Sequence, residues 1–205
     1  MNTRLKDEWV LDHASGAAPR AVRVLVDSAA EINPEIRAQL DVAERIGASL
    51  AMADLWSTTP AAPEVEDAII VETDQNPGDP LYPAALSGLG FRQNLSPWRS
   101  RLGGVRSRKV NRLCESGIDA RLFEIQPGAS IPDHDHGDQE LTLVLQGGFR
   151  DSNGIYHRGD VCVGEANEAH NPVGLDGEPC ICFSVAIGGY KFRNPLISIA
   201  ASFLK

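Results

Sequence analysis

Two histidines and a glutamate lie close together in the segment 131–148, which reads IPDHDHGDQELTLVLQGG. The chain has five histidines, and two of them, His134 and His136, stand two residues apart, four residues ahead of Glu140. Residues two apart on an extended strand share a face, so we expect all three side chains on one face of one continuous strand. Imidazole and carboxylate groups that converge in this way supply three of the four ligands that a transition metal usually takes.

A fourth ligand is expected from a second strand and turn, GDVCVGEANEAHNP, which contains His170. The alternative is a pair of exposed loop histidines beside an unrelated surface glutamate. The apolar run after Glu140 favours the metal site, because a carboxylate carried toward a core needs a partner charge. We therefore predict one divalent metal ion held by His134, His136, Glu140 and His170. Zinc is the expected ion, and iron, manganese and nickel are alternatives because these ligand types do not discriminate among them.

The elements that must position these ligands are short strands. From about residue 118 onward, apolar segments alternate with glycine turns: ARLFEIQPG, ELTLVLQGG, GDVCVGEA and CICFSVAIGG. Such a pattern without a helical period predicts an all-β sandwich or barrel. Leu141, Leu143 and Leu145 alternate with the ligand positions but are also apolar, so both faces of this strand should be covered. The second cover is the other sheet, the N-terminal helices or a second copy of the chain, which makes a homodimer one candidate.

Residues 1–56 have helical patterns instead. Asn33, Pro34 and Glu35 are typical of the start of a helix. Apolar residues then recur along one stripe at Ile36, Leu40, Ala43, Gly47 and Leu50. Shorter patterns cover residues 18–30 and about 5–13, so three helices are expected. Three helices in so short a segment make a thin core, which should lean on the rest of the chain or on a partner.

Composition separates the two halves and excludes some classes of function. Residues 57–83 contain five prolines, six acidic residues and no lysine or arginine, which is typical of a solvated linker. Residues 92–112 contain seven basic residues and no acidic one, but few aromatic residues interleave them, so outer strand positions are the preferred interpretation. A net charge of −9 argues against direct nucleic-acid binding. No secretory signal and no run of about 18 apolar residues is present, so we expect a cytoplasmic protein without a membrane contact.

Four cysteines are therefore expected as thiols or ligands and not as disulfides. Cys180 and Cys182 flank Ile181 on a predicted strand, so their thiols should point to one face. One hypothesis makes them redox thiols, because a nearby metal ion makes a thiol more acidic. The alternative is two small buried side chains. Cys114 and Cys162 are expected to be structural.

The spacing around the predicted ligands resembles the first cupin motif. Its positions are occupied in full by Gly128, His134, His136, Glu140 and Gly147. The second motif is partial: Gly159 and His170 are in place, but Glu165, Asn167 and Gly174 replace the usual proline, glycine and asparagine. The resemblance implies a jelly-roll barrel, or double-stranded β-helix, that holds a metal in its mouth through three histidines and one glutamate.

A wider resemblance covers most of residues 95–200. The segments PDHDHGDQELTLVLQGGFRD, CICF and WRSRLGGVR resemble the C-terminal half of ChrR-type anti-sigma factors, and residues 9–52 are similar in layout to that family's helical domain. In that family the helices clamp an extracytoplasmic-function sigma factor and block promoter binding. The resemblance implies a helical anti-sigma-like domain over 1–56, a linker over 57–83 and a cupin domain over 84–205.

The chain departs from that family at the zinc site of the helical domain. Two histidines and two cysteines hold zinc there, and alignment on Gly16 and Pro34 places the last three at Ala29, Asn33 and Ile36. The first falls near Arg4. None of these residues can bind zinc, so this domain is expected to fold by packing alone.

Two functions follow from the sequence. The first is a cytoplasmic anti-sigma factor whose cupin domain senses an oxidant or a small molecule and then weakens the clamp. The alternative is a metal-dependent, dioxygenase-like enzyme with a vestigial helical domain. An enzyme needs an acid or base beside the metal, and the candidates Asp133 and Asp138 fall on loop positions, so we favour the regulator. No residue is singled out for partner binding, although Leu40→Asp is expected to abolish partner capture.

Overall fold

The computed structural model describes residues 5–54, 81–88, 94–100 and 102–192. The helices are α1 (Asp7–Ser15), α2 (Arg20–Ile32), α3 (Pro34–Asp54) and α4 (Ala84–Ser87), with short 3-10 turns at Leu102–Gly104 and Asn111–Leu113. The strands are β1 (Arg99–Ser100), β2 (Val105–Lys109), β3 (Ile118–Ile125), β4 (His134–His136), β5 (Glu140–Gln146), β6 (Gly148–Arg150), β7 (Ile155–His157), β8 (Val161–Gly164), β9 (Val173–Gly174), β10 (Cys180–Ile187) and β11 (Tyr190–Phe192).

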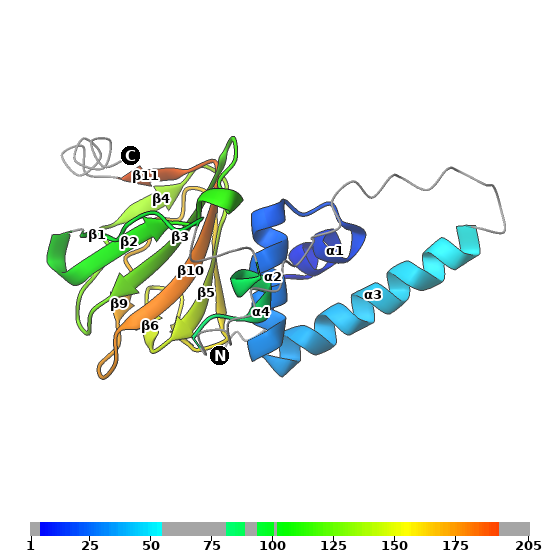
Figure 1. Ribbon diagram of the computed structural model, residues 1–205, viewed down its shortest axis with the longest axis horizontal. Coiled ribbons are helices and arrows are strands. Elements are labelled where there is room, and N and C mark those ends of the chain that lie inside the picture. Colours follow the sequence, from blue (N-terminus) through cyan, green and yellow to red (C-terminus); the bar gives the residue numbers. More distant parts are fainter. Residues whose placement is uncertain (1–4, 55–80, 89–93, 101, 193–205) are drawn as a thin grey trace.

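The helices precede a β-barrel, as the sequence predicts (Figure 1). The expected fold class, an all-α N-terminal part followed by a cupin barrel, is confirmed. The domain bounds at residues 56 and 84 stay a prediction, and most of the predicted linker 57–83 lies outside the described residues. No helix in the described part of the chain has the length and apolar character needed to cross a membrane.

The barrel is antiparallel throughout its described pairings. One sheet has the order β1-β2-β3-β10-β5-β8, a second pairs β11 with β4, and a third has the order β7-β6-β9. β3 and β10 pair along their whole lengths, from Ile118 opposite Ile187 to Ile125 opposite Cys180. Inside the barrel, a cluster that includes Val144, Phe149 and Cys182 fills the space below the mouth.

Helix starts and ends follow the local signals. The side chain of Asn33 accepts a hydrogen bond from the N–H of Glu35 at 3.0 Å, so it caps α3 as expected. Gly16 ends α1 in the left-handed conformation, with φ at 76°, where a glycine carries no Cβ penalty.

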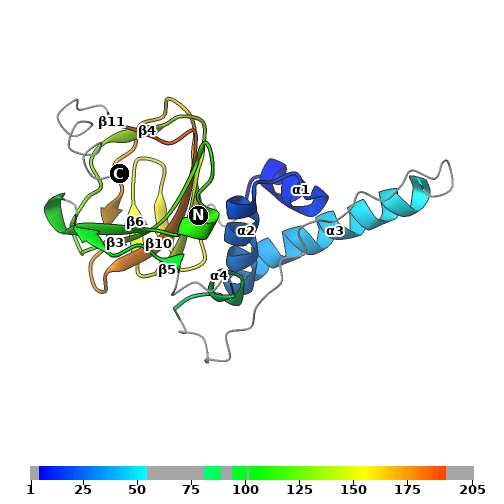
Figure 2. The same cartoon turned by 45° about the horizontal axis from the view of Figure 1, so that its top comes forward.

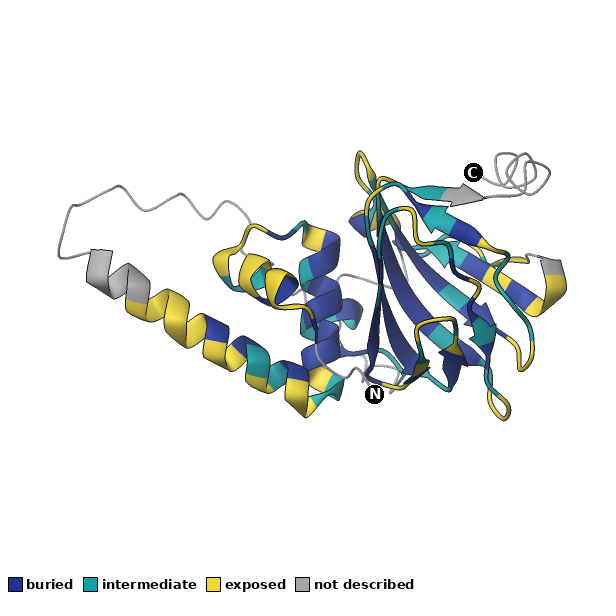
Figure 3. Cartoon of the chain, turned by 180° about the vertical axis from the view of Figure 1, so that it is seen from behind, coloured by how far each residue is buried: buried dark blue, intermediate teal, exposed yellow. Residues whose placement is uncertain are grey.

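The apolar stripe of α3 is shorter than the sequence suggests. Ile36, Leu40 and Ala43 are buried, but Gly47 is exposed, and the side chain of Leu50 lies outside the described residues. Figure 3 shows the reason: beyond its first turns α3 extends past the other helices, and its described surface there is mostly exposed. The predicted helical period is correct, but the part of the protein that covers the apolar stripe ends at Ala43.

The helical part forms an apolar core that includes Ala29 and Ile36, two of the positions to which the sequence resemblance assigns zinc ligands. Ala29, Ile36 and Leu40 are fully buried there, and Trp9 is 7% exposed. The amide of Gln39 adds two hydrogen bonds to the backbone of Leu5, at 3.2 Å to its N–H and 3.1 Å to its carbonyl. Apolar packing and these two hydrogen bonds of Gln39 therefore hold the three helices together in the described chain.

The barrel provides the second support for the helices. α2 contacts β10 and β5, and Figure 2 shows it lying along that side of the barrel while α1 and α3 project away. Leu141, Leu143 and Leu145 are fully buried in one cluster with Val22 and Leu25 of α2. The N-terminal helices are therefore the second cover that the doubly apolar strand requires, and a second copy of the chain is not needed for it.

Candidate metal centre

The four predicted ligands converge at the mouth of the barrel. Their ligand atoms all lie within 4.8 Å of one another, and all four residues are buried. Oε2 of Glu140 lies 3.8 Å from Nε2 of His134, 3.4 Å from that of His136 and 3.5 Å from that of His170. Nε2 of His170 lies 3.2 Å from Nε2 of each of the other two histidines.

The ligands do not come from one continuous strand. His134 and His136 belong to β4, which pairs with β11, whereas Glu140 begins β5 in the large sheet. The break falls at Gly137, where an added Cβ would overlap the backbone of Gly188. The chain thus changes sheets between the second and third ligand. His170 joins β4 through a backbone bridge to His134.

The hydrogen-bond partners of Nδ1 define the tautomers of His134 and His170. Nδ1 of His134 lies 3.0 Å from the carbonyl oxygen of Pro132, and Nδ1 of His170 lies 3.0 Å from Oδ2 of Asp151. A carbonyl and a carboxylate accept hydrogen bonds, so each Nδ1 donates and each neutral ring keeps a lone pair on Nε2. A carboxylate that orients a ligating histidine through its outer nitrogen is a common companion of metal sites.

This donor set fits a divalent cation. Lone pairs of imidazole nitrogens and a carboxylate oxygen point at one small volume, where they repel one another unless a cation or a proton lies between them. With bonds of about 2.1 Å, neighbouring ligand nitrogens lie about 3.0 Å apart in an octahedron and about 3.4 Å apart in a tetrahedron. The observed separation of 3.2 Å lies between these values. The residues therefore form a buried three-histidine, one-glutamate site that could hold a metal.

Burial and the neighbouring charges set the protonation of the site. Burial lowers the pKa of His136 to about 4, so this ring is a neutral ligand at pH 7. Burial also acts to lower the pKa of His170, but hydrogen bonds to Asp151 and Glu140 outweigh it and raise that pKa to about 9. Burial alone would raise the pKa of Glu140, whereas the side chains of His134 and His170 beside it hold that pKa well below its usual value. The glutamate is therefore a carboxylate, and any proton at the site belongs to the histidines.

Three residues around the ligands were not found from the sequence. Asp151 holds His170, while Ser184 and Tyr190 both donate to Oε1 of Glu140, the tyrosine at 2.9 Å. Ser184 lies two residues after Cys182 on the same strand, so it could be predicted to point to the same face as Cys180 and Cys182. Asp151 follows the end of β6 and Tyr190 begins β11, and no local spacing indicates that they reach the ligands.

The two candidate redox thiols lie inside the barrel. Cys180 and Cys182 are both 1% exposed and pack with Ile125 and Val144. A hydrogen bond with Cys180 and burial together raise the pKa of Cys182 well above its usual value. A buried protonated thiol is a weak nucleophile, so Cys180 and Cys182 have the properties expected of two small buried side chains.

The two residues considered as acids or bases for an enzyme are exposed to solvent. Asp133 and Asp138 are both exposed, as expected for loop positions.

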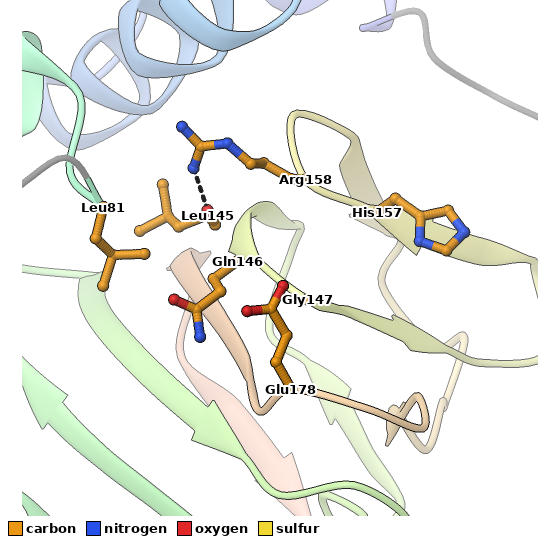
Figure 4. A pocket seen from close by; sticks show the side chains of 7 residues that line it. All are labelled: Leu81, Leu145, Gln146, Gly147, His157, Arg158 and Glu178. Atoms are coloured by element: carbon orange, nitrogen blue, oxygen red, sulfur yellow. Dashed lines mark hydrogen bonds between the residues drawn. The ribbon is translucent and has the colours of Figure 1, made fainter.

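A cavity of about 630 Å³ opens at the far end of β5, about 20 Å along the strand from Glu140. None of the four ligands lines this cavity, in which Arg158 donates to the carbonyl oxygen of Leu145 (Figure 4). Its lining residues are Leu81, Leu145, Gln146, Gly147, His157, Arg158 and Glu178.

The fold and the site define a class of protein: a cupin whose barrel carries a buried candidate metal centre, preceded by a small helical domain. Residues 89–187 match the family described as the ChrR Cupin-like domain. The chain is 30% identical over 214 residues to the anti-sigma-E factor ChrR of Cereibacter sphaeroides, across 98% of this chain and 97% of that protein. The chain therefore belongs to the ChrR family of anti-sigma factors.

A solved structure shows the same arrangement. It is the crystal structure of Rhodobacter sphaeroides SigE in complex with the anti-sigma factor ChrR, and the similarity has a TM-score of 0.69 at 31% identity. It covers 89% of this chain and 97% of the matched one. The similarity thus includes the order of the helical part and the barrel as well as the barrel itself.

Proposed function

We propose that this protein acts in the cytoplasm as an anti-sigma factor that binds an extracytoplasmic-function sigma factor through its helices. We further propose that its barrel holds one divalent metal ion, with zinc as the first candidate, and responds to an oxidant or a small molecule. The observation that carries the proposal is the full-length similarity to ChrR, whose related structure is a complex with a sigma factor.

The exposed apolar residues of the helices support a partner at this surface. Leu11 on α1 is 56% exposed, and Val42 and Ile46 on α3 are 48% and 51% exposed. Val42 and Ile46 are four residues apart and so share one face of α3. Large exposed apolar side chains that cluster on one element are typical of interaction sites.

Leu40 is not part of this surface. It is fully buried among the helices, so Leu40→Asp would disrupt the core of the domain and would report on folding more than on partner contact. A test of the interaction must change residues that the core does not need.

The structure suggests how the barrel could influence the helices. Glu140 points into the mouth, while the next residue, Leu141, packs under the helices in the opposite direction. On β10, Ser184 binds Glu140 from inside, and its neighbours Phe183 and Val185 belong to the core shared with α2. On one face, β5 therefore supplies the candidate ligand Glu140 and β10 supplies its partner Ser184, while the other face of both strands packs against the helices. In this proposal, a rearrangement of the ligands is transmitted through β5 and β10 to the surface on which α2 packs.

A polar contact makes a second link between the two parts. Lys6, just before α1, forms an ion pair with Glu165, and the amide of Gln139 donates to the same carboxylate at 2.8 Å. Gln139 immediately precedes the ligand Glu140. Because Lys6 and Glu165 are partly exposed, this contact orients the parts more than it stabilises them.

The proposal is tested by capture of the sigma factor with the purified chain. We expect the double variant Val42→Asp, Ile46→Asp to lose binding by at least tenfold, since two charges replace apolar contacts at the surface. The matched control is Ile155→Asp, a change of an equally exposed isoleucine on β7 of the barrel, which should bind like wild type. Undiminished binding by the folded double variant would contradict a sigma contact at this face of α3.

A further inference from the structure

The chain folds back over the metal centre directly after β10. Gly188 and Gly189 follow one another in the left-handed conformation, with φ of 75° and 76°. Two such residues in a row make a sharp reversal that residues with a Cβ rarely adopt. The reversal lays β11 beside β4, with Tyr190 opposite His136 (Figure 1).

Backbone contacts hold this reversal in place. The N–H of Gly137 donates to the carbonyl oxygen of Gly189 at 2.8 Å, and that of Asp138 donates to Ile187 at 3.0 Å. The N–H of Gly188 donates to Gly117 at 2.7 Å. The turn between the two ligand strands and the turn after β10 are thus packed backbone against backbone.

The reversal directs Tyr190 at the ligands. Its hydroxyl donates to Oε1 of Glu140 at 2.9 Å, and its ring centre lies 5.8 Å from that of His134 and 6.0 Å from that of His136. Ser184 donates to the same oxygen from β10. Oε1 is therefore occupied by two hydroxyl donors, and Oε2 is the oxygen that faces the three histidines.

We propose that Tyr190 is a positioning residue and that Gly188, Gly189 and Tyr190 form a latch over the metal centre. The hydroxyl groups of Tyr190 and Ser184 hold the carboxylate of Glu140 in the orientation that presents one oxygen to a cation. The pairing of β11 with β4 closes the mouth beside the ligands. The inference rests on the proposed metal centre and adds the residues that set how tightly and how long a cation is held.

The test compares Tyr190→Phe with wild type in the full chain, with Zn²⁺ and Co²⁺ as probes. Loss of a group that orients a ligand weakens metal affinity by about 10- to 100-fold, which competition with a chromophoric chelator measures. We also expect faster release of Zn²⁺ to excess chelator and an altered visible spectrum of bound Co²⁺, because the carboxylate is free to turn. A purely structural role would lower the melting temperature of the metal-free protein and leave the Co²⁺ spectrum unchanged.

The matched control is Tyr82→Phe. This variant also loses a hydrogen-bonded hydroxyl, which accepts from Arg108 of β2 and contacts none of the four candidate ligands by any described hydrogen bond. This variant should keep wild-type affinity and spectrum. Should Tyr190→Phe not fold, Ser184→Ala carries the same expectation, because it removes the other donor to Oε1.

The outcomes separate the latch from the metal centre itself. Wild-type affinity, release rate and Co²⁺ spectrum in Tyr190→Phe would overturn the latch and leave the metal centre standing. Failure of wild type to bind either ion would overturn both. Weaker binding and an altered spectrum in Tyr190→Phe, with Tyr82→Phe unchanged, would establish the latch.

Discussion

At the scale of single residues, Glu140 governs the site. It is a buried carboxylate with a depressed pKa, surrounded by three imidazoles and two hydroxyl donors. A buried charge is tolerated when it is paired and hydrogen-bonded, and here the carboxylate accepts from Ser184 and Tyr190 and faces three histidines. Apolar strands would not place such a group in their core without a function for it.

Removal of one histidine tests the site directly. In His136→Ala we expect the metal content to fall from about one ion per chain to near zero, because three ligands remain of a set of four. Elemental analysis of the purified protein measures this ratio. The control is His157→Ala, which removes an exposed histidine of the same barrel and should leave the ratio unchanged. An undiminished ratio in His136→Ala would contradict the assignment.

At the scale of elements, each part of the fold is held by a neighbour from another part of the sequence. The short helix α4 packs on α2, although more than 50 residues separate them along the chain. The carboxylate of Glu31 accepts hydrogen bonds from the N–H groups of Ala84 and Ala85 at 2.6 and 2.8 Å. The last turn of α2 therefore caps the first turn of α4.

Loss of this cap should loosen α4. We expect Glu31→Ala to lower the free energy of unfolding by about 1 kcal/mol, since two backbone donors lose a charged acceptor at a helix start. Urea unfolding followed by circular dichroism measures the change. Glu178→Ala removes an exposed carboxylate of the barrel and serves as the control. Equal unfolding midpoints for the two variants would show that the cap contributes nothing measurable.

At the scale of the whole molecule, the helical part and the barrel share one apolar core. The cluster that contains Leu25 of α2 also contains Leu143 of β5 and Phe183 of β10. The strands β5 and β10 therefore connect the mouth of the barrel to the helices. Two packed parts with a common core respond together when either is loosened.

Metal removal should reveal this coupling. We expect chelator treatment to increase amide hydrogen exchange in β5 and β10 and also in α2, because the strands lose the ligand cluster that braces their inner face. Exchange followed by mass spectrometry measures each segment. The same treatment of His136→Ala, which lacks the metal from the start, should produce no further increase. Unchanged exchange in α2 of wild type would argue against the coupling.

The sequence by itself determined the candidate ligand set and the order of the two parts. His134, His136, Glu140 and His170 were identified from residue types and spacing, and the structure brings their ligand atoms together. The helical and strand periods, with the cap at Asn33, placed the elements. These features are local, because a ligand type or an amphipathic period is written in neighbouring residues.

The tertiary structure alone decided what surrounds these features. It moved the first two ligands to a separate strand, brought Asp151, Ser184 and Tyr190 to the site, and placed α2 over the outer face of β5. It also buried Leu40 while leaving Val42 and Ile46 exposed on the same helix. Contacts between distant segments depend on how whole faces pack, and a face that is apolar in sequence does not specify which partner covers it.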